Sequence, residues 1–216
     1  MIKFLNQNLL KQALTHRSWV NENTKNNGTN ERLEFLGDAI LEFVVSLSIY
    51  NKFPNEEEGY LTALRANLVN TKNLSQVAEK LNLGVDIYLS KGEEEGGGRT
   101  NPSLLADTVE AVIGALYLDQ GIEAVEDFIG KYILIDVDKK AKAPLKDPKS
   151  LLQEKVQSKN QGAPKYQVVS EIGPDHNKKF TVEVIINGKA GSRGVGKSKS
   201  EAEQDAASNT LKDMLK

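Results

Sequence analysis

The sequence predicts a two-part protein, an all-α domain followed by an α+β domain with the element order αβββα. Three observations support this prediction. Apolar residues recur at helical spacing through residues 1–135 of the 216-residue chain. A charged stretch that contains Pro144 and Pro148 begins at Asp136 and interrupts the pattern. Beyond it, residues 180–186 alternate between apolar and polar side chains, as in a half-buried strand.

Five helices are expected in the first part, and capping residues and breakers set some of their bounds. Asn30 is a good N-cap for the second helix, and Pro54 ends it. Segments 21–30 and 91–101 are polar and Gly-rich without periodicity, so both should be exposed loops. The expected helices are 8–19, 30–53, 59–81, 102–118 and 122–134.

The second part is expected to begin with a helix and to contain one three-stranded sheet. Asn187 and Gly188 form a strong two-residue hairpin signal between the second and third strands. The expected elements are a helix at 148–159, strands at 166–171, 180–186 and 190–195, and a helix at 200–215. The predicted organisation is therefore a helical domain at 1–135, a flexible linker at 136–147 and an α+β domain at 148–216.

Composition favours an intracellular protein that acts on a polyanion. Residues 1–147 hold 16 Lys and Arg against 22 Asp and Glu, whereas residues 148–216 hold 12 against 8. The chain has no Cys, and 39% of its residues are hydrophobic, enough for packed cores without disulfides. The start of the chain shows no signal-peptide pattern, and no apolar run is long enough to span a membrane. We therefore expect a cytoplasmic protein without a membrane partner, with an acidic catalytic part and a basic binding part.

Five acidic residues form two clusters at helical spacing. Glu31, Glu34 and Asp38 share one helix face, and Asp107 and Glu110 share another. Oxygen ligands without Cys suit Mg²⁺, with Mn²⁺ as a substitute, rather than Zn²⁺. The competing interpretation is that these acids form the solvated sides of two amphipathic helices. Apolar neighbours leave little of either helix exposed, which favours a metal site.

Four sequence blocks closely resemble the bacterial ribonuclease III family, and they occur in the family order. They are ALTHRSW at 13–19, NERLEFLGDAIL at 30–41, EGYLTALRANLV at 58–69 and NPSLLADTVEAVIGALYLDQG at 101–121. The resemblance covers nearly the whole chain. It implies a ribonuclease III endonuclease domain followed by a double-stranded RNA-binding domain, which is what the αβββα order looks like.

The resemblance also assigns roles to the acids. Glu34, Asp38, Asp107 and Glu110 match the family's metal-binding centre, with Asp38 and Glu110 as its catalytic residues. Glu31 and Glu58 match supporting acids beside the centre. A metal ion of this kind lowers the pKa of bound water and stabilises the entering and leaving oxygens, so neither a covalent nucleophile nor an organic cofactor is expected. The products implied are 5′-phosphate and 3′-hydroxyl ends.

Two strands of a duplex require two such centres, and the resemblance implies a two-fold homodimer that supplies them. Phe35 matches a family position that packs into a socket on the partner, although the sequence alone would favour an ordinary core phenylalanine. Other neighbours of the acids are expected to be structural. Arg32 and Arg65 should pair with the acids, Glu42 should be solvated, and His16 and Arg17 should hold the first helix.

The RNA-binding residues implied by the resemblance lie in three patches of the second domain. They are Ser150, Gln153, Glu154 and Gln157 on the first helix, His176 in the GPDH loop, and Lys197 and Lys199 in GKSKS. A-form RNA is read there mainly by shape, through its minor grooves and phosphates. Ser200 stands where the family usually has a second basic residue, which implies weaker phosphate affinity.

The expected function is cleavage of double-stranded RNA, including precursors of ribosomal RNA and some messenger RNAs. Two alternatives belong to other classes. One is an adaptor that only binds duplex RNA with a degenerate nuclease fold, against which all four matching acids are present. The other is a helical scaffold unrelated to RNA, which leaves the basic αβββα part unexplained.

Overall fold

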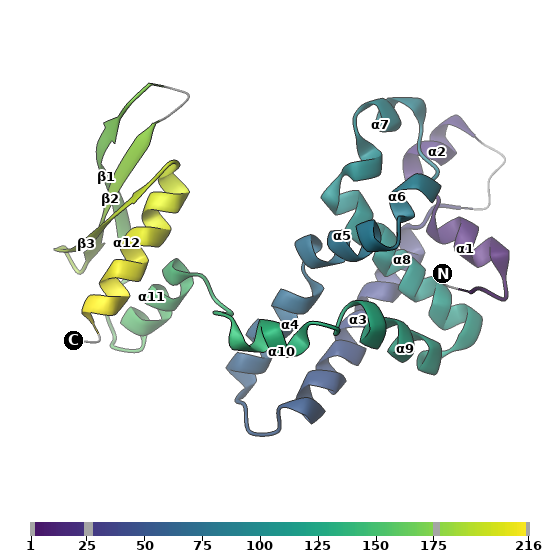
Figure 1. Cartoon of the computed structure of the whole chain (residues 1–216), viewed down its shortest axis with the longest axis horizontal. Helices are drawn as coiled ribbons and strands as arrows, with labels where there is room; N and C mark the ends of the chain where they lie inside the picture. The colour runs from purple at the N-terminus through teal and green to yellow at the C-terminus, as the bar shows by residue number, and fades with distance from the viewer. Residues whose placement is uncertain (1–2, 24–27, 175–177, 215–216) are drawn as a thin grey trace. The chain divides into compact units, whose positions relative to one another are not determined.

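The computed structural model describes residues 3–23, 28–174 and 178–214, and the chain divides into two compact units at 1–145 and 146–216 (Figure 1). Within these described residues, helices are the only regular elements of the first unit, and the second has one sheet and two helices, which confirms the predicted fold class. The helices of the first unit are α1 (Gln7–Ala13), α2 (Arg17–Glu22), α3 (Glu31–Lys52), α4 (Glu58–Val69), α5 (Thr71–Lys80), α6 (Leu83–Asp86), α7 (Lys91–Glu95), the 3₁₀ helix η1 (Gly98–Thr100), α8 (Pro102–Gln120), α9 (Ile122–Tyr132) and α10 (Val137–Lys142).

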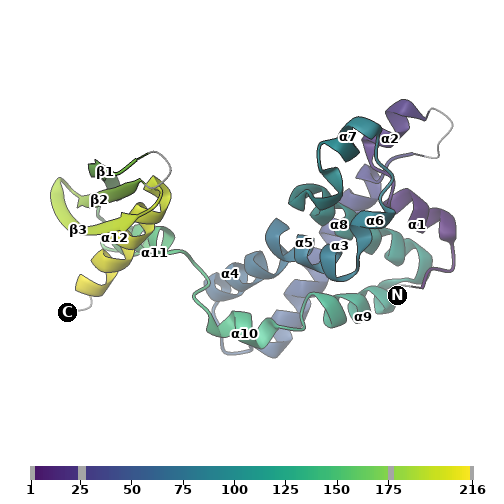
Figure 2. The same cartoon turned by 45° about the horizontal axis from the view of Figure 1, so that its top comes forward.

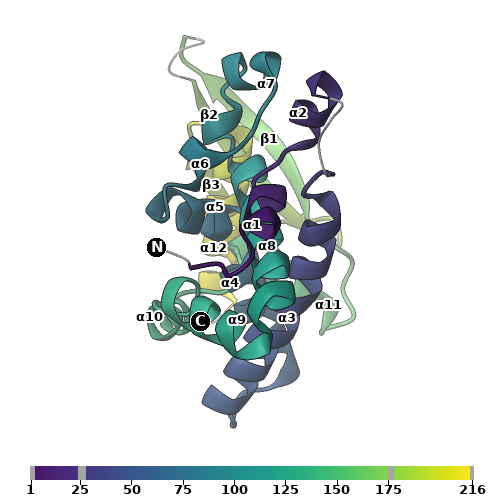
Figure 3. The same ribbon diagram turned by 90° about the vertical axis from the view of Figure 1, so that its right-hand side faces the viewer.

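Helix α8 is the centre of the helical unit, because it packs against α3, α5, α1 and α9 (Figures 2 and 3). Its segment from Ala111 to Leu116 is buried without interruption, so it lacks a polar side there. The N-cap Asn101 accepts hydrogen bonds from the backbone of Ser103 and Leu104, with Pro102 as the first helical residue. The acid-bearing end of α8 is therefore anchored in the core.

Two of the five expected helices are each split in two. The predicted helix at 8–19 breaks because Thr15 forms an isolated parallel bridge with Tyr88, and the neighbouring backbone pairs with the same residue. The predicted helix at 59–81 breaks at Asn70, which is extended and whose side chain caps α5 through the backbone nitrogen of Asn73. The expected loop at 91–101 contains α7 and η1. Asn30 precedes α3 as expected but makes no side-chain cap.

Most of the expected linker packs against α4 in the helical unit. The hydroxyl of Tyr60 donates to the carbonyl of Ala141 at 2.9 Å, and the Asn67 side-chain amide donates to the carbonyl of Leu145 at 2.7 Å. The Lys140 ammonium in turn donates to the Asn67 carbonyl at 3.2 Å. Residues 137–145 therefore form a docked strap that includes α10, where we had expected a flexible connection.

The second unit has the order α11 (Pro148–Gln157), β1 (Lys165–Ile172), β2 (Lys179–Ile186), β3 (Lys189–Gly196) and α12 (Lys199–Asp213), as predicted. The strands are antiparallel in the order β1-β2-β3. Asn187 and Gly188 both have positive φ, of 49° and 76°, as a tight β2–β3 hairpin turn requires. Leu152 and Val156 of α11 join Val182 and Val184 of β2 and the alanines of α12 in one buried cluster.

Among residues 3–23, 28–174 and 178–214, no helix has both the length and the apolar character needed to cross a bilayer.

Candidate active site

Two glycines let α3 and α8 cross with their backbones in contact. Gly37 and Gly114 are both buried at the crossing. A Cβ atom added at Gly37 would overlap the carbonyl oxygen of Glu110 and lie 2.9 Å from the backbone nitrogen of Gly114. A Cβ atom at Gly114 would overlap the carbonyl oxygen of Leu33. Only glycine fits at either position, so backbone contact sets the distance between the acid-bearing faces.

The crossing brings three of the predicted carboxylates together. Glu34 of α3 meets Asp107 and Glu110 of α8, and carboxylate oxygens of all three lie within 4.8 Å of one another. All three side chains are half-buried. None of them belongs to an ion pair within the described part of the chain. We call these three residues the carboxylate triad.

The protein environment makes it costly to ionise the triad. Burial, followed by the charges of Asp38, Asp107 and Glu34, raises the pKa of Glu110 to about 7. Burial and then the charge of Asp107 also raise the pKa of Glu34. The pKa of Asp107 is raised by burial, an effect that the nearby His16 opposes. A bound cation would lower the pKa of all three carboxyls, because it favours their ionised forms.

The donor set suits a hard divalent ion. The triad offers only anionic oxygens, which are the ligands that Mg²⁺ and Mn²⁺ prefer, and Zn²⁺ more often takes Cys or His. Partial exposure of all three residues leaves room for water and for a substrate oxygen at the same ion. The residues present therefore fit the metal centre that the sequence predicts.

The other two acids of the stripe lie at the edge of this centre. Asp38 is exposed and does not belong to the triad, although its charge raises the pKa of both Glu110 and Glu34. Glu31 is exposed and lines a pocket of about 320 Å³ together with Glu34 and Asp107. Its carboxylate accepts a hydrogen bond from Thr29 at 2.9 Å. The role of Asp38 as a ligand and that of Glu31 as a supporting acid stay predictions.

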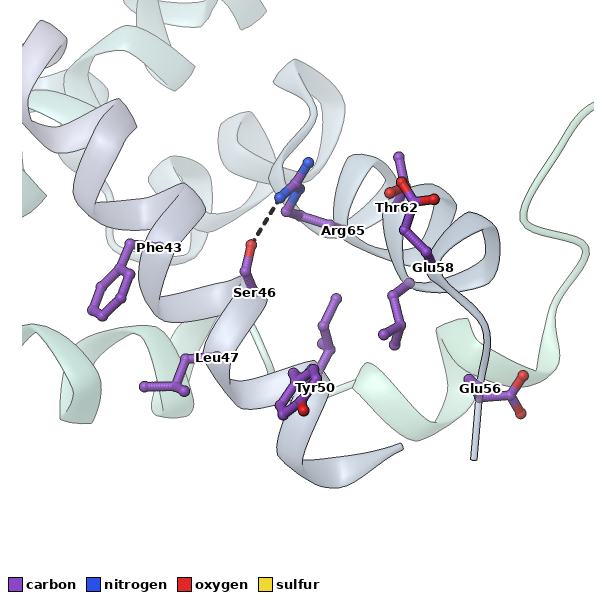
Figure 4. A pocket seen from close by; sticks show the side chains of 10 residues that line it. Phe43, Ser46, Leu47, Tyr50, Glu56, Glu58, Thr62 and Arg65 are labelled. Carbon is purple, nitrogen blue, oxygen red and sulfur yellow. Dashed lines mark hydrogen bonds between the residues drawn. The ribbon is translucent and has the colours of Figure 1, made fainter. Parts of the chain in front are cut away.

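Glu58 lies elsewhere within this chain. It is the first residue of α4 and lines a different pocket with Ser46 and Tyr50 (Figure 4). Ser46 follows Glu34 by twelve residues on α3, which corresponds to about 18 Å along the helix. The expectation that Glu58 sits beside the acidic centre is therefore not met in a single chain.

The two arginines meet the expectation of ion pairs with the acids only in part. Arg65 pairs at 2.7 Å with Glu42, not with an acid of the carboxylate triad, so Glu42 is not simply solvated. Arg65 also donates to the Ser46 hydroxyl at 2.9 Å (Figure 4). Arg32 is exposed and forms no ion pair with any described residue. Arg17 instead approaches Glu31, at 3.8 Å.

Phe35 is not a core residue of this chain, because 79% of its surface is exposed. Three further large apolar side chains of α3, Phe43, Leu47 and Tyr50, are exposed as well. They line the pocket that contains Glu58, which has a volume of about 540 Å³ and which we call the α3–α4 pocket (Figure 4). An unpaired apolar surface of this kind marks an interaction site.

The predicted RNA-binding residues of α11 share one exposed face. They are Ser150, Gln153, Glu154 and Gln157, at offsets of three, four and seven residues. Glu154 forms an ion pair with Lys146 at 2.6 Å, and the Ser150 hydroxyl donates to Asp147 at 2.7 Å. Both groups still reach solvent, so contact with the 2′-hydroxyls of a duplex remains open to them.

Lys197, Lys199 and Ser200 are exposed at the start of α12. Ser198 caps this helix by accepting from the backbone nitrogen of Glu201, whose carboxylate accepts from the nitrogen of Lys197. Lysines at a helix N-terminus suit a phosphate backbone. His176, the remaining predicted contact, lies outside the described residues.

Gly37 and Gly114 were not predicted from the sequence to be part of the site. Both glycines lie near the acids in the interior of a helix, where glycine costs stability unless another backbone approaches closely. A close helix crossing beside the acids could therefore have been predicted.

Comparisons with known proteins agree with this arrangement. Residues 6–137 match the family model described as Ribonuclease-III-like, and residues 148–214 match the double-stranded RNA binding motif. The chain is 51% identical over 211 residues to Ribonuclease 3 of Geobacillus sp. (strain WCH70), covering 97% of this chain and 86% of that protein. It is 47% identical over 216 residues to Ribonuclease 3 of Bacillus licheniformis, covering all of this chain and 87% of that protein.

A solved structure of the nuclease domain of ribonuclease III from Campylobacter jejuni superposes with a TM-score of 0.57 at 45% identity. The match covers 61% of this chain and 89% of that domain. Nucleases of this family are metal-dependent, and the carboxylate triad lies within the matched helical unit. The chain therefore belongs to the ribonuclease III family, as an endoribonuclease with a C-terminal double-stranded RNA-binding domain.

Proposed function

We propose that this chain hydrolyses phosphodiester bonds of double-stranded RNA with Mg²⁺ held by Glu34, Asp38, Asp107 and Glu110. The observation that supports this most is the carboxylate triad, three half-buried acids within 4.8 Å that have no ion-pair partner among the described residues. Mg²⁺ bound there supplies a water of lowered pKa and charge stabilisation of the scissile phosphate. Asp38 and Glu110 hold the reacting groups in place, and the products carry 5′-phosphate and 3′-hydroxyl ends.

A long RNA duplex tests this proposal directly. We expect cleavage with Mg²⁺ and none with EDTA, and end-labelling should find 5′-phosphate on the products. Glu110→Gln should abolish cleavage while duplex binding persists, since it removes one metal-ligating charge from the triad. Glu126→Gln, on the exposed side of α9, is the matched control and should cut normally. Normal turnover by Glu110→Gln in Mg²⁺ would refute the assignment.

We further propose that the chain acts as a two-fold homodimer in which Phe35 of each copy enters the α3–α4 pocket of the other. Phe35 lies on α3, and α3 also forms one wall of the pocket. Two antiparallel copies of this helix would therefore make the contact between Phe35 and the pocket twice, as an isologous interface requires. The C. jejuni nuclease domain is described as structurally flexible in a region involved in dimer formation. One triad per copy would then supply one cut for each strand.

The dimer also gives Glu58 a place near an acidic centre. Glu58 lines the pocket proposed to receive Phe35 of the second copy, and Phe35 is adjacent to Glu34 on α3. Across the interface, Glu58 would therefore approach the second copy's triad, in the supporting role predicted for it.

The proposed substrates are precursors of ribosomal RNA and some messenger RNAs, which places the activity in the cytoplasm. Depleting the protein in its host and sequencing RNA ends tests this. Accumulation of ribosomal precursors with intact stems is the expected result, and unchanged precursor levels would contradict it.

A further inference from the structure

His16 lies on the wall of the pocket that contains Glu31, Glu34 and Asp107, although its own chain segment belongs to neither acid-bearing helix. It precedes α2 and is half-buried. Its ring acts on Asp107 electrostatically, opposing the effect of burial on the pKa of that carboxyl. The imidazole therefore lies within electrostatic reach of the triad from outside it.

Two hydrogen bonds to Nδ1, and a third that orients its serine partner, fix the ring. The backbone nitrogen of Ser18 donates to His16 Nδ1 at 3.3 Å, and the Ser18 hydroxyl lies 2.8 Å from the same atom. That hydroxyl accepts from the backbone nitrogen of Ser90 at 3.1 Å, which leaves its proton free to point at Nδ1. Nδ1 is thus an acceptor, which places a ring hydrogen on Nε2.

The backbone beside the ring is held by the same neighbouring segment. The His16 nitrogen donates to the Tyr88 carbonyl at 3.1 Å, and the Tyr88 nitrogen donates to the Leu14 carbonyl at 2.8 Å. The rings of Trp19 and Tyr88 also pack together, with centroids 5.5 Å apart. Both the main chain and the imidazole are therefore fixed before any substrate arrives.

Capping of α2 uses only one of the two ring nitrogens. An acceptor at this position is all that a cap requires, and Ser, Thr, Asp or Asn supplies it more readily than His. Nε2 forms no hydrogen bond with any described residue. A fixed N–H donor is thus available on the wall of an acidic pocket in a nuclease.

We propose that His16 is a substrate-contacting residue whose Nε2–H donates a hydrogen bond to a non-bridging phosphate oxygen of the RNA strand held over the triad. The proposal rests on the proposed function, since it assumes that the scissile strand passes this pocket. A donor that is already oriented would bind the phosphate without the cost of ordering a mobile side chain.

Two variants separate the capping nitrogen from the donor. His16→Asn places an amide oxygen where Nδ1 lies and so keeps the cap, but it removes the distal N–H. His16→Gln places an amide nitrogen near Nε2 and keeps a donor, but it weakens the cap. We expect His16→Asn to melt as the wild type does and to cut a long duplex about 10- to 100-fold more slowly, the range for one hydrogen bond to a charged group. His16→Gln should melt earlier but cut within a few-fold of the wild type at a temperature where both are folded.

A binding measurement keeps this test apart from the test of cleavage. In a Glu110→Gln background, a short duplex with one phosphate replaced by a neutral methylphosphonate is compared with the unmodified duplex. His16→Asn should weaken binding of the unmodified duplex several-fold. When the methylphosphonate replaces the phosphate that His16 contacts, His16→Asn should leave binding of that modified duplex unchanged.

The proposal is overturned if His16→Asn cuts like the wild type, if His16→Gln is as slow as His16→Asn, or if no replaced phosphate shows this coupling. Failure of the wild type to cut in Mg²⁺ would refute the proposed function instead, and the binding measurement would still decide the role of His16.

Discussion

Glu110 combines a raised pKa with a position at the centre of the triad, so the metal-free protein should lose stability as pH rises. The unfolded chain ionises this carboxyl near pH 4.5, whereas the folded chain does so near pH 7. Between these values the folded state holds more protons, and its stability falls with increasing pH. We expect the melting temperature without metal to decrease across this window.

Added Mg²⁺ should restore the melting temperature, and more strongly above pH 7 than below it, because the ion binds the ionised carboxylates. Thermal melts at several pH values, with and without Mg²⁺, measure both effects. Glu110→Gln is the control, and it should flatten the pH dependence and weaken the response to Mg²⁺. A wild-type chain whose response to Mg²⁺ is the same at pH 5 and pH 8 would contradict this account.

Helical spacing predicted only which acids share a helix face, as Asp107 and Glu110 do. The meeting of Glu34 with these two acids joins two helices, and it was predicted from the family resemblance. Glu58 was assigned by resemblance alone, and no pattern within one chain could show that it lines another pocket. Arg65 and Glu42 pair across α3 and α4, a contact that depends on the crossing of two helices.

At the scale of elements, the glycine crossing of α3 and α8 should be intolerant of a single methyl group. Gly37→Ala and Gly114→Ala each force a side-chain atom into a backbone carbonyl, so the helices must separate. We expect each variant to melt earlier and to lose Mg²⁺-dependent cleavage. The reason is that the triad spans both helices.

Gly130→Ala on α9 is a matched control for this prediction. A Cβ atom there meets nothing within 4 Å, and alanine favours a helix by about 1 kcal/mol over glycine. This variant should be as stable as the wild type or more stable. Equal melting temperatures for Gly114→Ala and Gly130→Ala would show that the crossing tolerates a larger separation.

The start of α12 allows a prediction about phosphate contacts. Ser200→Lys places a second lysine in the exposed first turn of α12, where the helix dipole disfavours it by about 0.3–1 kcal/mol in the free protein. Contact with an RNA phosphate should offset this cost in the complex. The variant should therefore melt slightly earlier, bind duplex RNA more tightly and steepen the dependence of log K on log salt by about one.

Ser208→Lys adds the same charge two turns further along α12 and serves as the control. Salt titrations of the two variants and the wild type give the comparison. An unchanged slope for Ser200→Lys would mean that this position does not face the phosphates.

Sequence patterns could not predict the ends of helices where those ends depend on tertiary contacts. Residues 8–19 are periodic throughout, yet the bridge between Thr15 and Tyr88 interrupts them through a partner distant in the sequence. The break at Asn70 could have been predicted, because asparagine is a preferred N-cap residue. It was missed because the apolar pattern continues through this position. The αβββα part was predicted well because alternation and the Asn187-Gly188 turn are local signals.

At the scale of the whole molecule, the exposed apolar side of α3 predicts association between two chains. Phe35→Ala should weaken the dimer by about 100-fold or more, since truncating a buried phenylalanine costs about 3–5 kcal/mol. Sedimentation at sub-micromolar concentration measures the change. Tyr50→Ala, on the receiving pocket, should have an effect in the same direction.

Val85→Ala serves as the control, because Val85 is also an exposed apolar residue, at 64%, but lies on α6. It should leave the dimer unchanged. An undisturbed dimer in Phe35→Ala would refute the proposed socket, and a wild-type chain that stays monomeric would refute the dimer itself.

The docked strap at 137–145 shortens the stretch of chain that can act as a tether. A free tether of twelve residues would have a root-mean-square span of about 20 Å. Docking through Tyr60 and Asn67 ends the strap at Leu145, and α11 begins at Pro148, so the three peptide links between these two residues span about 11 Å at most. A change in the length of residues 137–145 would therefore have to break contacts with α4 before it altered the tether.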